Sequence, residues 1–129
     1  MPSEDATTDA TAWEWAYTQL FGTVPPLPAA KLRFLGDVAP AALDRVEKLR
    51  AGAFFDETLD PKTVQLLLFA MLLVQGSGPA RWHALAARRA GAAWEELAAV
   101  VDLATAVSAL GPSNLGGQVL EELRRDEDS

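Results

Sequence analysis

A single histidine, His83, is the residue best suited to acid–base chemistry in this sequence of 129 residues. Imidazole can give and take a proton near neutral pH without any shift of its pKa. Two neighbours could serve the same reaction, since Arg81 supplies a guanidinium and Trp82 an indole. A lone histidine in a helix is nevertheless more often structural than catalytic, and spacing alone leaves both roles open.

A second group of candidates lies on the apolar segment that precedes this histidine. Lys62, Gln65 and Phe69 are spaced at i, i+3 and i+7. On a helix this spacing places all three on one face, so the ammonium and the amide project together.

Other possible sites have ordinary structural explanations. Glu95 and Glu96 could be a paired carboxylate, but consecutive helical residues point about 100° apart, and acidic residues in a first turn usually compensate the helix dipole. Trp13 and Trp15 could line a pocket or bind a partner, although packing is the more common role of such residues. The glycine-rich segments 76–78 and 111–117 lack the ending of a phosphate-binding loop and follow no strand, so we interpret them as turns.

The elements that would position these residues are predicted to be helices. Apolar spacing of three and four predicts helices over residues 10–21 and 40–49, ended near Gly22 and Gly52. Three prolines in residues 23–28 predict an extended connector, followed by a short helix over residues 29–35.

The second half of the chain predicts a helical hairpin and two further helices. Asp60 as N-cap and Pro61 at the first position predict a helix over residues 61–75, apolar nearly all round and therefore central and buried. The next helix is expected over residues 79–90, with Gly91 as its cap. Two more are expected over residues 93–110 and, after a break at Gly111 and Pro112, to about residue 125.

The predicted fold is all-α, a bundle of five or six helices with no strand and no repeat. Residues 10–125 form one domain, because the chain is too short for two domains of ordinary size. The polar residues 1–9 and 126–129 are expected to be solvated tails.

Composition excludes several classes of function. The formal charge is −7 with no basic patch, which argues against nucleic-acid binding. The chain has no cysteine and one histidine, so disulfides, thiol chemistry and metal sites with two imidazoles are impossible, although an all-carboxylate metal site is not.

The location and assembly of the chain can also be predicted. The acidic, polar N-terminus does not look like a secretory signal, and the apolar run 64–74 is too short to span a membrane, so a cytoplasmic protein without membrane contact is expected. An apolar central helix, four tryptophans and an alanine-rich hairpin give more apolar surface than one small protomer can cover. We therefore expect a homo-oligomer, with a well-filled monomer as the alternative.

Several of these segments together resemble the carboxymuconolactone decarboxylase and alkylhydroperoxidase D-like superfamily. The similar segments are LDPKT at 59–63, the apolar helix after it, the span from His83 to Gly91, EEL at 95–97, and GP at 111–112. The resemblance extends over roughly residues 14–123, and its specific part over 57–114. It implies an all-helical fold and a homo-oligomer, commonly a trimer or hexamer.

The resemblance also indicates a branch of the superfamily. The peroxidase branch is similar but carries a Cys-x-x-Cys at the positions of Gly76 and Pro79, so this chain is not a peroxidase of that kind. The decarboxylase branch lacks the dithiol and acts on a carboxylated lactone of aromatic catabolism without a metal or organic cofactor. This chain is more similar to the decarboxylase branch.

Roles for individual residues follow from that resemblance. Loss of CO2 leaves an enolate, which needs donors for its oxygen and an acid for its carbon. The resemblance implies proton transfer at His83, assisted by Gln65. Binding of a small carboxylated or lactone substrate is expected from Lys62, Arg81, Phe69 and Trp82.

Two positions depart from the pattern of the family. Gln65 stands where many members have a glutamate, and an amide can orient the imidazole by a hydrogen bond but cannot raise its pKa by charge. Ala93 stands where the family usually has a Ser or Thr N-cap, which affects stability alone. Two hypotheses follow: a cofactor-independent lyase, or a related isomerase or hydrolase, and a catalytically inactive member that is an oligomeric scaffold or small-molecule binding protein.

Overall fold

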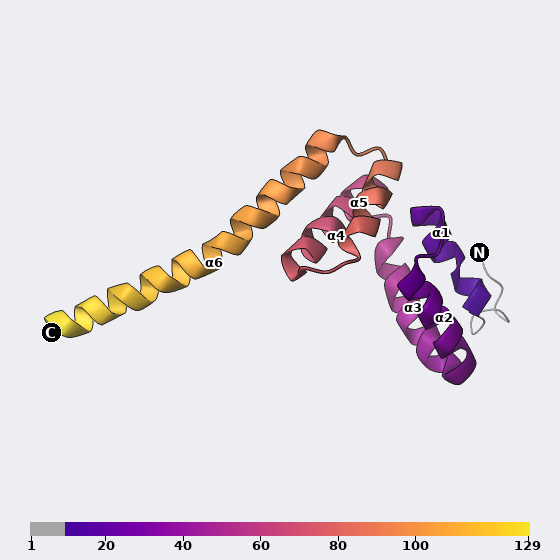
Figure 1. The fold of residues 1–129 in the computed structure, drawn as a ribbon, viewed down its shortest axis with the longest axis horizontal. Helices are drawn as coiled ribbons and strands as arrows, with labels where there is room; N and C mark the ends of the chain where they lie inside the picture. Colours follow the sequence, from indigo (N-terminus) through magenta and orange to yellow (C-terminus); the bar gives the residue numbers. More distant parts are fainter. Residues whose placement is uncertain (1–9) are drawn as a thin grey trace.

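The computed structural model describes residues 10–129, which are helical with no strand in that range (Figure 1). The predicted tail at residues 1–9 lies outside the described residues. A 3-10 turn, η2 (Ala10–Trp13), is followed by six α-helices: α1 (Trp15–Phe21), α2 (Pro26–Val38), α3 (Pro40–Phe54), α4 (Pro61–Gln75), α5 (Ala80–Arg89) and α6 (Trp94–Asp128).

Two apolar clusters hold the helices together. The first joins η2, α1, α2 and α3 to α5, and its buried members are Trp13, Ala16, Tyr17, Phe21, Leu32, Leu43 and Ala86. The second lies between α4, α5 and the start of α6, and its buried members are Phe69, Ala80, Ala87, Ala92, Leu97 and Val100. Because α5 contributes to both clusters, it is the element that connects the two halves of the protein.

The α4 helix begins and ends where its sequence predicts. The Asp60 carboxylate accepts a hydrogen bond from the Thr63 N–H at 2.9 Å, and Gly76 ends the helix in a left-handed conformation. The expected full burial of this helix is wrong for one chain: Leu67, Met71 and Val74 are each about half exposed. Within residues 10–129 only one side of α4 packs against other helices, so the apolar residues on its other side are exposed.

The N-terminal helices extend further than the sequence predicts. α2 begins at Pro26 rather than residue 29, because prolines are tolerated in a first turn, whose N–H groups have no helical partner. α3 continues past Gly52 to Phe54, since one glycine costs a helix only about 1 kcal/mol. The predicted helix over 10–21 is divided into η2 and α1.

The predicted break at Gly111 and Pro112 is wrong, because α6 is one continuous helix. Proline removes its own N–H bond, its ring clashes with the carbonyl of residue i−4, and a further clash is with the Cβ of the residue before it. Gly111 has no Cβ, which reduces this clash. The helix also includes residues 126–128, which were expected to be a tail.

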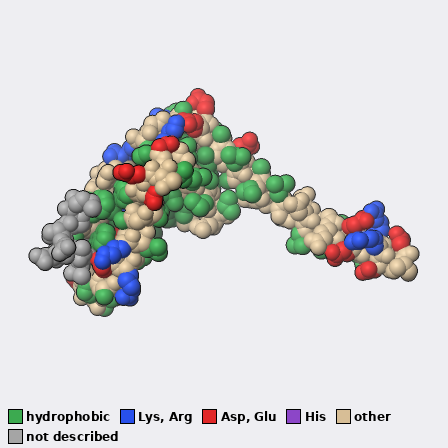
Figure 2. Space-filling model, turned by 180° about the vertical axis from the view of Figure 1, so that it is seen from behind, with side chains coloured by type: hydrophobic (Ala, Val, Ile, Leu, Met, Phe, Trp, Pro, Cys, Tyr) green, Lys and Arg blue, Asp and Glu red, His purple; other side chains and the backbone are tan. Residues whose placement is uncertain are grey.

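The second half of α6 extends away from the rest of the protein (Figure 1). Side chains from residue 105 onward are exposed, apart from a half-buried Gly116. Figure 2 shows apolar side chains along this extension and charged side chains at its tip. By length and composition α6 could also span a membrane, the only helix among the described residues that could.

Candidate functional site

His83 and Gln65 form a buried hydrogen-bonded pair between α5 and α4. The imidazole Nδ1 lies 2.7 Å from the Gln65 Oε1, and both side chains are buried. An amide oxygen can only accept, so Nδ1 carries the proton and Nε2 carries the lone pair. The pair therefore fixes the neutral imidazole in one tautomer.

Two aromatic rings hold the imidazole from other helices. Phe21 of α1 and Phe54 of α3 approach it edge-on, with ring centroids 5.3 and 5.5 Å from that of His83. The histidine is thus placed by four helices rather than by α5 alone.

His83 lies in the wall of a largely apolar cavity of about 580 Å³, which is within the usual size range of small-molecule sites. Aromatic, aliphatic and proline side chains form most of the lining. Its charged or polar lining residues are Tyr17, Lys31, Arg50, Gln75 and His83. A cavity of this kind can bind a small molecule that has an apolar body and a polar group.

The surroundings of His83 favour the uncharged imidazole. Burial, and secondly the positive charge of Arg50, lower the pKa of His83 from 6.5 to about 4. At neutral pH the residue is therefore a proton acceptor. A bound anion beside Arg50 would oppose that charge and move the pKa upward.

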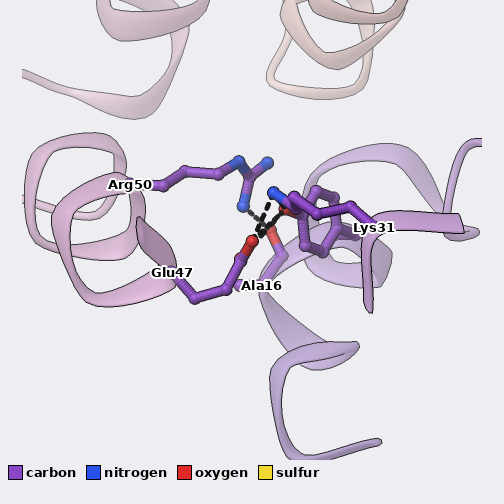
Figure 3. A network of polar contacts seen from close by, with 5 residues as sticks. Ala16, Lys31, Glu47 and Arg50 are labelled. Atoms are coloured by element: carbon purple, nitrogen blue, oxygen red, sulfur yellow. Dashed lines mark hydrogen bonds and ion pairs between the residues drawn. The ribbon is translucent and has the colours of Figure 1, made fainter. Parts of the chain in front are cut away.

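A polar cluster of Tyr17, Lys31, Glu47 and Arg50 lies at the wall of the cavity. Figure 3 shows Lys31, Glu47 and Arg50 converging from two helices. The Tyr17 hydroxyl donates to the fully buried Glu47 carboxylate, with oxygen separations of 2.8 and 2.9 Å. Lys31 forms an ion pair with this carboxylate and donates to the tyrosine oxygen at 2.8 Å. Glu47 therefore has a cation and a hydroxyl to compensate its burial.

In this cluster the pKa values of Tyr17 and Lys31 are raised. Burial is the largest effect on Tyr17 and raises the pKa of its hydroxyl, so Tyr17 is neutral at pH 7. Burial alone would lower the pKa of Lys31, but hydrogen bonds to Glu47 and Tyr17 outweigh it and raise the pKa, so Lys31 stays charged.

Arg50 is a half-buried cation that forms no ion pair within residues 10–129, although the charge of Glu47 acts on it from a longer distance. It donates to the Ala16 carbonyl at 3.0 Å, and its guanidinium carbon lies 3.8 Å from the ring centroid of Tyr17 and 4.8 Å from that of Phe54. Burial lowers the pKa of this group, which nonetheless stays protonated. Lys31 and Arg50 against Glu47 leave one positive charge in excess at this wall of the cavity.

A second cavity, of about 900 Å³, is lined by Gln65 but not by His83. Phe54 lines both cavities. The hydrogen-bonded pair thus lies between the two, with its base on the side of the smaller, more apolar cavity.

The structure brings together three of the six candidate residues. His83 and Gln65 form the pair, and Trp82 lines the same cavity, with its ring 5.7 Å from that of Phe21. The other three, Lys62, Arg81 and Phe69, do not line this cavity.

Each of those three has a different environment. The Lys62 ammonium lies 3.0 Å from the Glu96 carboxylate, an ion pair between α4 and α6. Arg81 lines a separate cavity of about 550 Å³, together with Trp94. Phe69 is buried in the cluster between α4, α5 and α6.

The residues given structural explanations have structural contacts. Glu96 accepts a hydrogen bond from the Ala93 N–H at 2.8 Å, which satisfies one free donor at the start of α6. Trp13 is buried in the first cluster, and the ring of Trp15 lies 5.1 Å from that of Phe55. Packing is therefore the observed role of both tryptophans.

Sequence reasoning missed Tyr17, Lys31, Glu47 and Arg50. They come from three helices, so no local spacing connects them. One signal in the sequence could have identified Glu47. It is three or four residues from Leu43, Arg50 and Ala51, so on a helix it lies on the same face as two apolar residues.

A comparison with family models found a match. Residues 40–114, more than half of the chain, match the model described as the carboxymuconolactone decarboxylase family. The chain belongs to the carboxymuconolactone decarboxylase family. The matched range includes Glu47, Arg50, Gln65 and His83, whereas Tyr17 and Lys31 lie outside it.

Two further comparisons, with curated proteins and with solved structures, found no match to the chain. Among the described residues no group of three or more His, Asp or Glu side chains is arranged to hold a metal ion.

Proposed function

We propose that this member of the carboxymuconolactone decarboxylase family is a cofactor-independent lyase that transfers a proton on a small carboxylated or lactone substrate. The observation that carries the proposal is the His83–Gln65 pair in the wall of an apolar cavity. A base of fixed tautomer beside a cavity is the arrangement that proton transfer requires.

The two protonation states of His83 fit two steps. In the empty cavity the imidazole is neutral, because burial and Arg50 disfavour its charged form. A substrate anion offsets the charge of Arg50 and attracts the imidazolium, which forms when His83 takes a proton from solvent as the substrate binds. When the bond from the ring to the carboxylate breaks, the electron pair stays on the substrate as an enolate, the imidazolium gives its proton to the enolate carbon, and CO2 leaves.

A second candidate is a family member that binds a small molecule without turnover. Gln65 favours this alternative, because a neutral amide cannot stabilise an imidazolium as a carboxylate would. The low pKa of His83 is consistent with it. Both candidates place a ligand in the same cavity.

The test is CO2 release and ultraviolet absorbance change with carboxymuconolactone, for the wild type, His83→Ala and Gln65→Glu. The lyase predicts turnover that falls by a factor of about 10² or more in His83→Ala. Gain of turnover only in Gln65→Glu indicates a binding protein that has lost the reaction. No turnover in any of the three contradicts the proposed reaction.

We also propose that a second copy of the chain covers the exposed apolar side of α4 and α6. This side includes Met71 and Val74 of α4 and Leu103, Val107 and Leu110 of α6, each more than half exposed. The accessible surface is 8567 Å², whereas a compact monomer of this mass exposes about 6,600 Å². The excess of about 2,000 Å² is in the range that stable homo-oligomers bury.

A second copy is a better occupant of this side than lipid. Asp102 and Asn114 lie within the apolar part of α6, and such groups are costly in a bilayer. Light scattering coupled to size exclusion tests this assembly: Val107→Glu should reduce the molar mass, and Leu49→Glu, an exposed control on α3, should not. A wild-type monomer, or binding of the wild type to lipid vesicles, contradicts it.

A further inference from the structure

Arg50 is a half-buried cation in a largely apolar cavity, and it forms no ion pair with a carboxylate of residues 10–129. Its guanidinium lines the cavity and lies against the faces of Tyr17 and Phe54. Withdrawing a cation from water without an adjacent anion costs free energy, and Glu47 acts on Arg50 only from beyond ion-pair distance, so an anion that reaches the guanidinium would be favoured. The Arg50 guanidinium donates a hydrogen bond to a backbone carbonyl, that of Ala16.

The neighbouring carboxylate does not fill this role. Glu47 is fully buried, and both of its oxygens accept from Tyr17, while Lys31 forms its ion pair. It is not among the residues that line the cavity. The cavity wall therefore includes Lys31, Arg50 and Tyr17, whereas the negative charge of Glu47 lies outside the lining.

The remainder of the cavity is suited to a planar apolar group. Phe21, Phe54 and Trp82 line it, together with leucines and prolines. His83 lies in the same lining, and its ring is in contact with Phe54, the residue over which Arg50 is placed. A ligand with its charge at Arg50 would thus extend its apolar part past the imidazole.

We infer that Arg50, supported by Lys31, is a carboxylate-binding residue that holds the acid group of a planar, apolar monocarboxylate in the His83 cavity. The guanidinium can donate two parallel hydrogen bonds to a carboxylate. Lys31 adds a weaker attraction, because Glu47 already neutralises most of its charge. This inference rests on the proposed function, since it assigns the residues that would hold the acid group of its substrate.

The same arrangement predicts selectivity between charged and neutral ligands of one shape. Benzoate and benzamide are nearly identical in size, and only benzoate carries a charge. The cavity should bind benzoate and discriminate against benzamide by about tenfold or more, the value of a hydrogen bond to a charged group.

The experiment is a titration of the tag-free chain with benzoate and with benzamide, followed by tryptophan fluorescence, to which Trp82 in the cavity contributes, and by calorimetry. Arg50→Gln should weaken benzoate binding by about tenfold or more and leave benzamide binding unchanged. Lys31→Gln should weaken benzoate binding by no more than about fivefold. Arg45→Gln, an exposed arginine on the same helix, is the matched control and should have no effect.

Arg50→Lys is the second variant, used in case Arg50→Gln does not fold, because it keeps the positive charge. It should bind benzoate with intermediate affinity, since an ammonium lacks the planar pair of donors of a guanidinium. Benzoate that binds equally well to the wild type and to Arg50→Gln overturns the inference, as does equal affinity for benzamide. Absence of benzoate binding to the wild type also overturns it. Because binding is measured without turnover, a chain that selects benzoate through Arg50 but releases no CO2 keeps the carboxylate site and rejects the lyase.

Discussion

The polar cluster beside the cavity and the distal half of α6 differ in where their compensating contacts lie. Glu47 is fully buried, yet Tyr17 and Lys31 compensate it within the same chain. Leu115, Leu120 and Leu123 of α6 are more than half exposed and lie on a part of α6 that extends away from the other helices. The charge of the cluster is thus compensated within one chain, whereas the apolar side chains of distal α6 would be buried only by another molecule.

Substitutions in the two regions should therefore have different effects. Changes in the cluster should alter the stability of the single chain and the electrostatics of the cavity. Changes in distal α6 should alter association and leave the fold of the protomer intact. Pairs of similar substitutions, one in each region, therefore test this difference.

The largest difference is expected for a carboxylate in each region. Glu47→Gln removes the buried ion-pair partner of Lys31 and should lower the free energy of unfolding by about 3 kcal/mol or more. Glu121→Gln removes the exposed ion pair with Arg124 in α6 and should cost no more than about 0.5 kcal/mol. Urea unfolding measures both, and equal effects would contradict the comparison.

The second prediction concerns pH and the buried histidine. The folded pKa of His83, about 4, lies below its unfolded value of 6.5. The unfolded chain therefore binds the proton first, and this contribution to stability is lost as the pH falls from about 6.5 to 4.

Between pH 7 and pH 5 the wild type should lose about 2 kcal/mol more than His83→Gln, measured by urea unfolding at both values. The α6 residues beyond 105 include no histidine, so Leu120→Ser should follow the wild-type pH dependence. The same pH dependence in wild type and His83→Gln would show that the imidazole is not desolvated.

A smaller effect is expected from a single hydroxyl group. Tyr17→Phe removes the hydrogen bond to Glu47 and should cost about 1 to 2 kcal/mol. Thr105→Val removes an exposed hydroxyl of α6, which donates only to the Val101 carbonyl, and should change stability by less than about 0.5 kcal/mol. Thermal unfolding of the two variants compares them, and a larger cost for Thr105→Val would reverse the assignment.

The smallest effect on protomer stability is expected for an apolar residue of distal α6. Leu120→Ser should change the free energy of unfolding by no more than about 0.5 kcal/mol, measured in dilute protein where unfolding does not depend on concentration. Its side chain is 65% exposed, so the single chain loses little burial. A loss of about 2 kcal/mol would mean that Leu120 is buried in the folded protomer.

The sequence predicted the helices best where local chemistry determines their ends. Asp60 and Pro61 begin α4, and Gly76 ends it, because a cap, a first-turn proline and a left-handed glycine each act within one turn. The continuation of α6 through Pro112 could not be predicted in the same way, since the absence of a Cβ at Gly111 lessens the usual restriction.

The candidate site was predicted in part. His83 and Gln65 lie on adjacent helices joined by a short turn, so their pairing could be expected from the family resemblance, and the structure places them 2.7 Å apart. Lys62 shares a predicted face with Gln65 but pairs with Glu96 of α6, because helix spacing does not determine which neighbour a long side chain reaches. The contacts of Tyr17 with Lys31 and Glu47 depend on how three helices pack, which no local pattern contains.

The most direct test of the central claim is the titration of His83 by nuclear magnetic resonance. The chain has one histidine, so a tag-free sample gives a single set of imidazole signals. We predict a pKa of about 4 and a proton on Nδ1 at pH 7 in the free protein, with a higher pKa when benzoate is bound. A pKa near 6.5 that benzoate does not change would contradict a base desolvated in an anion-binding cavity.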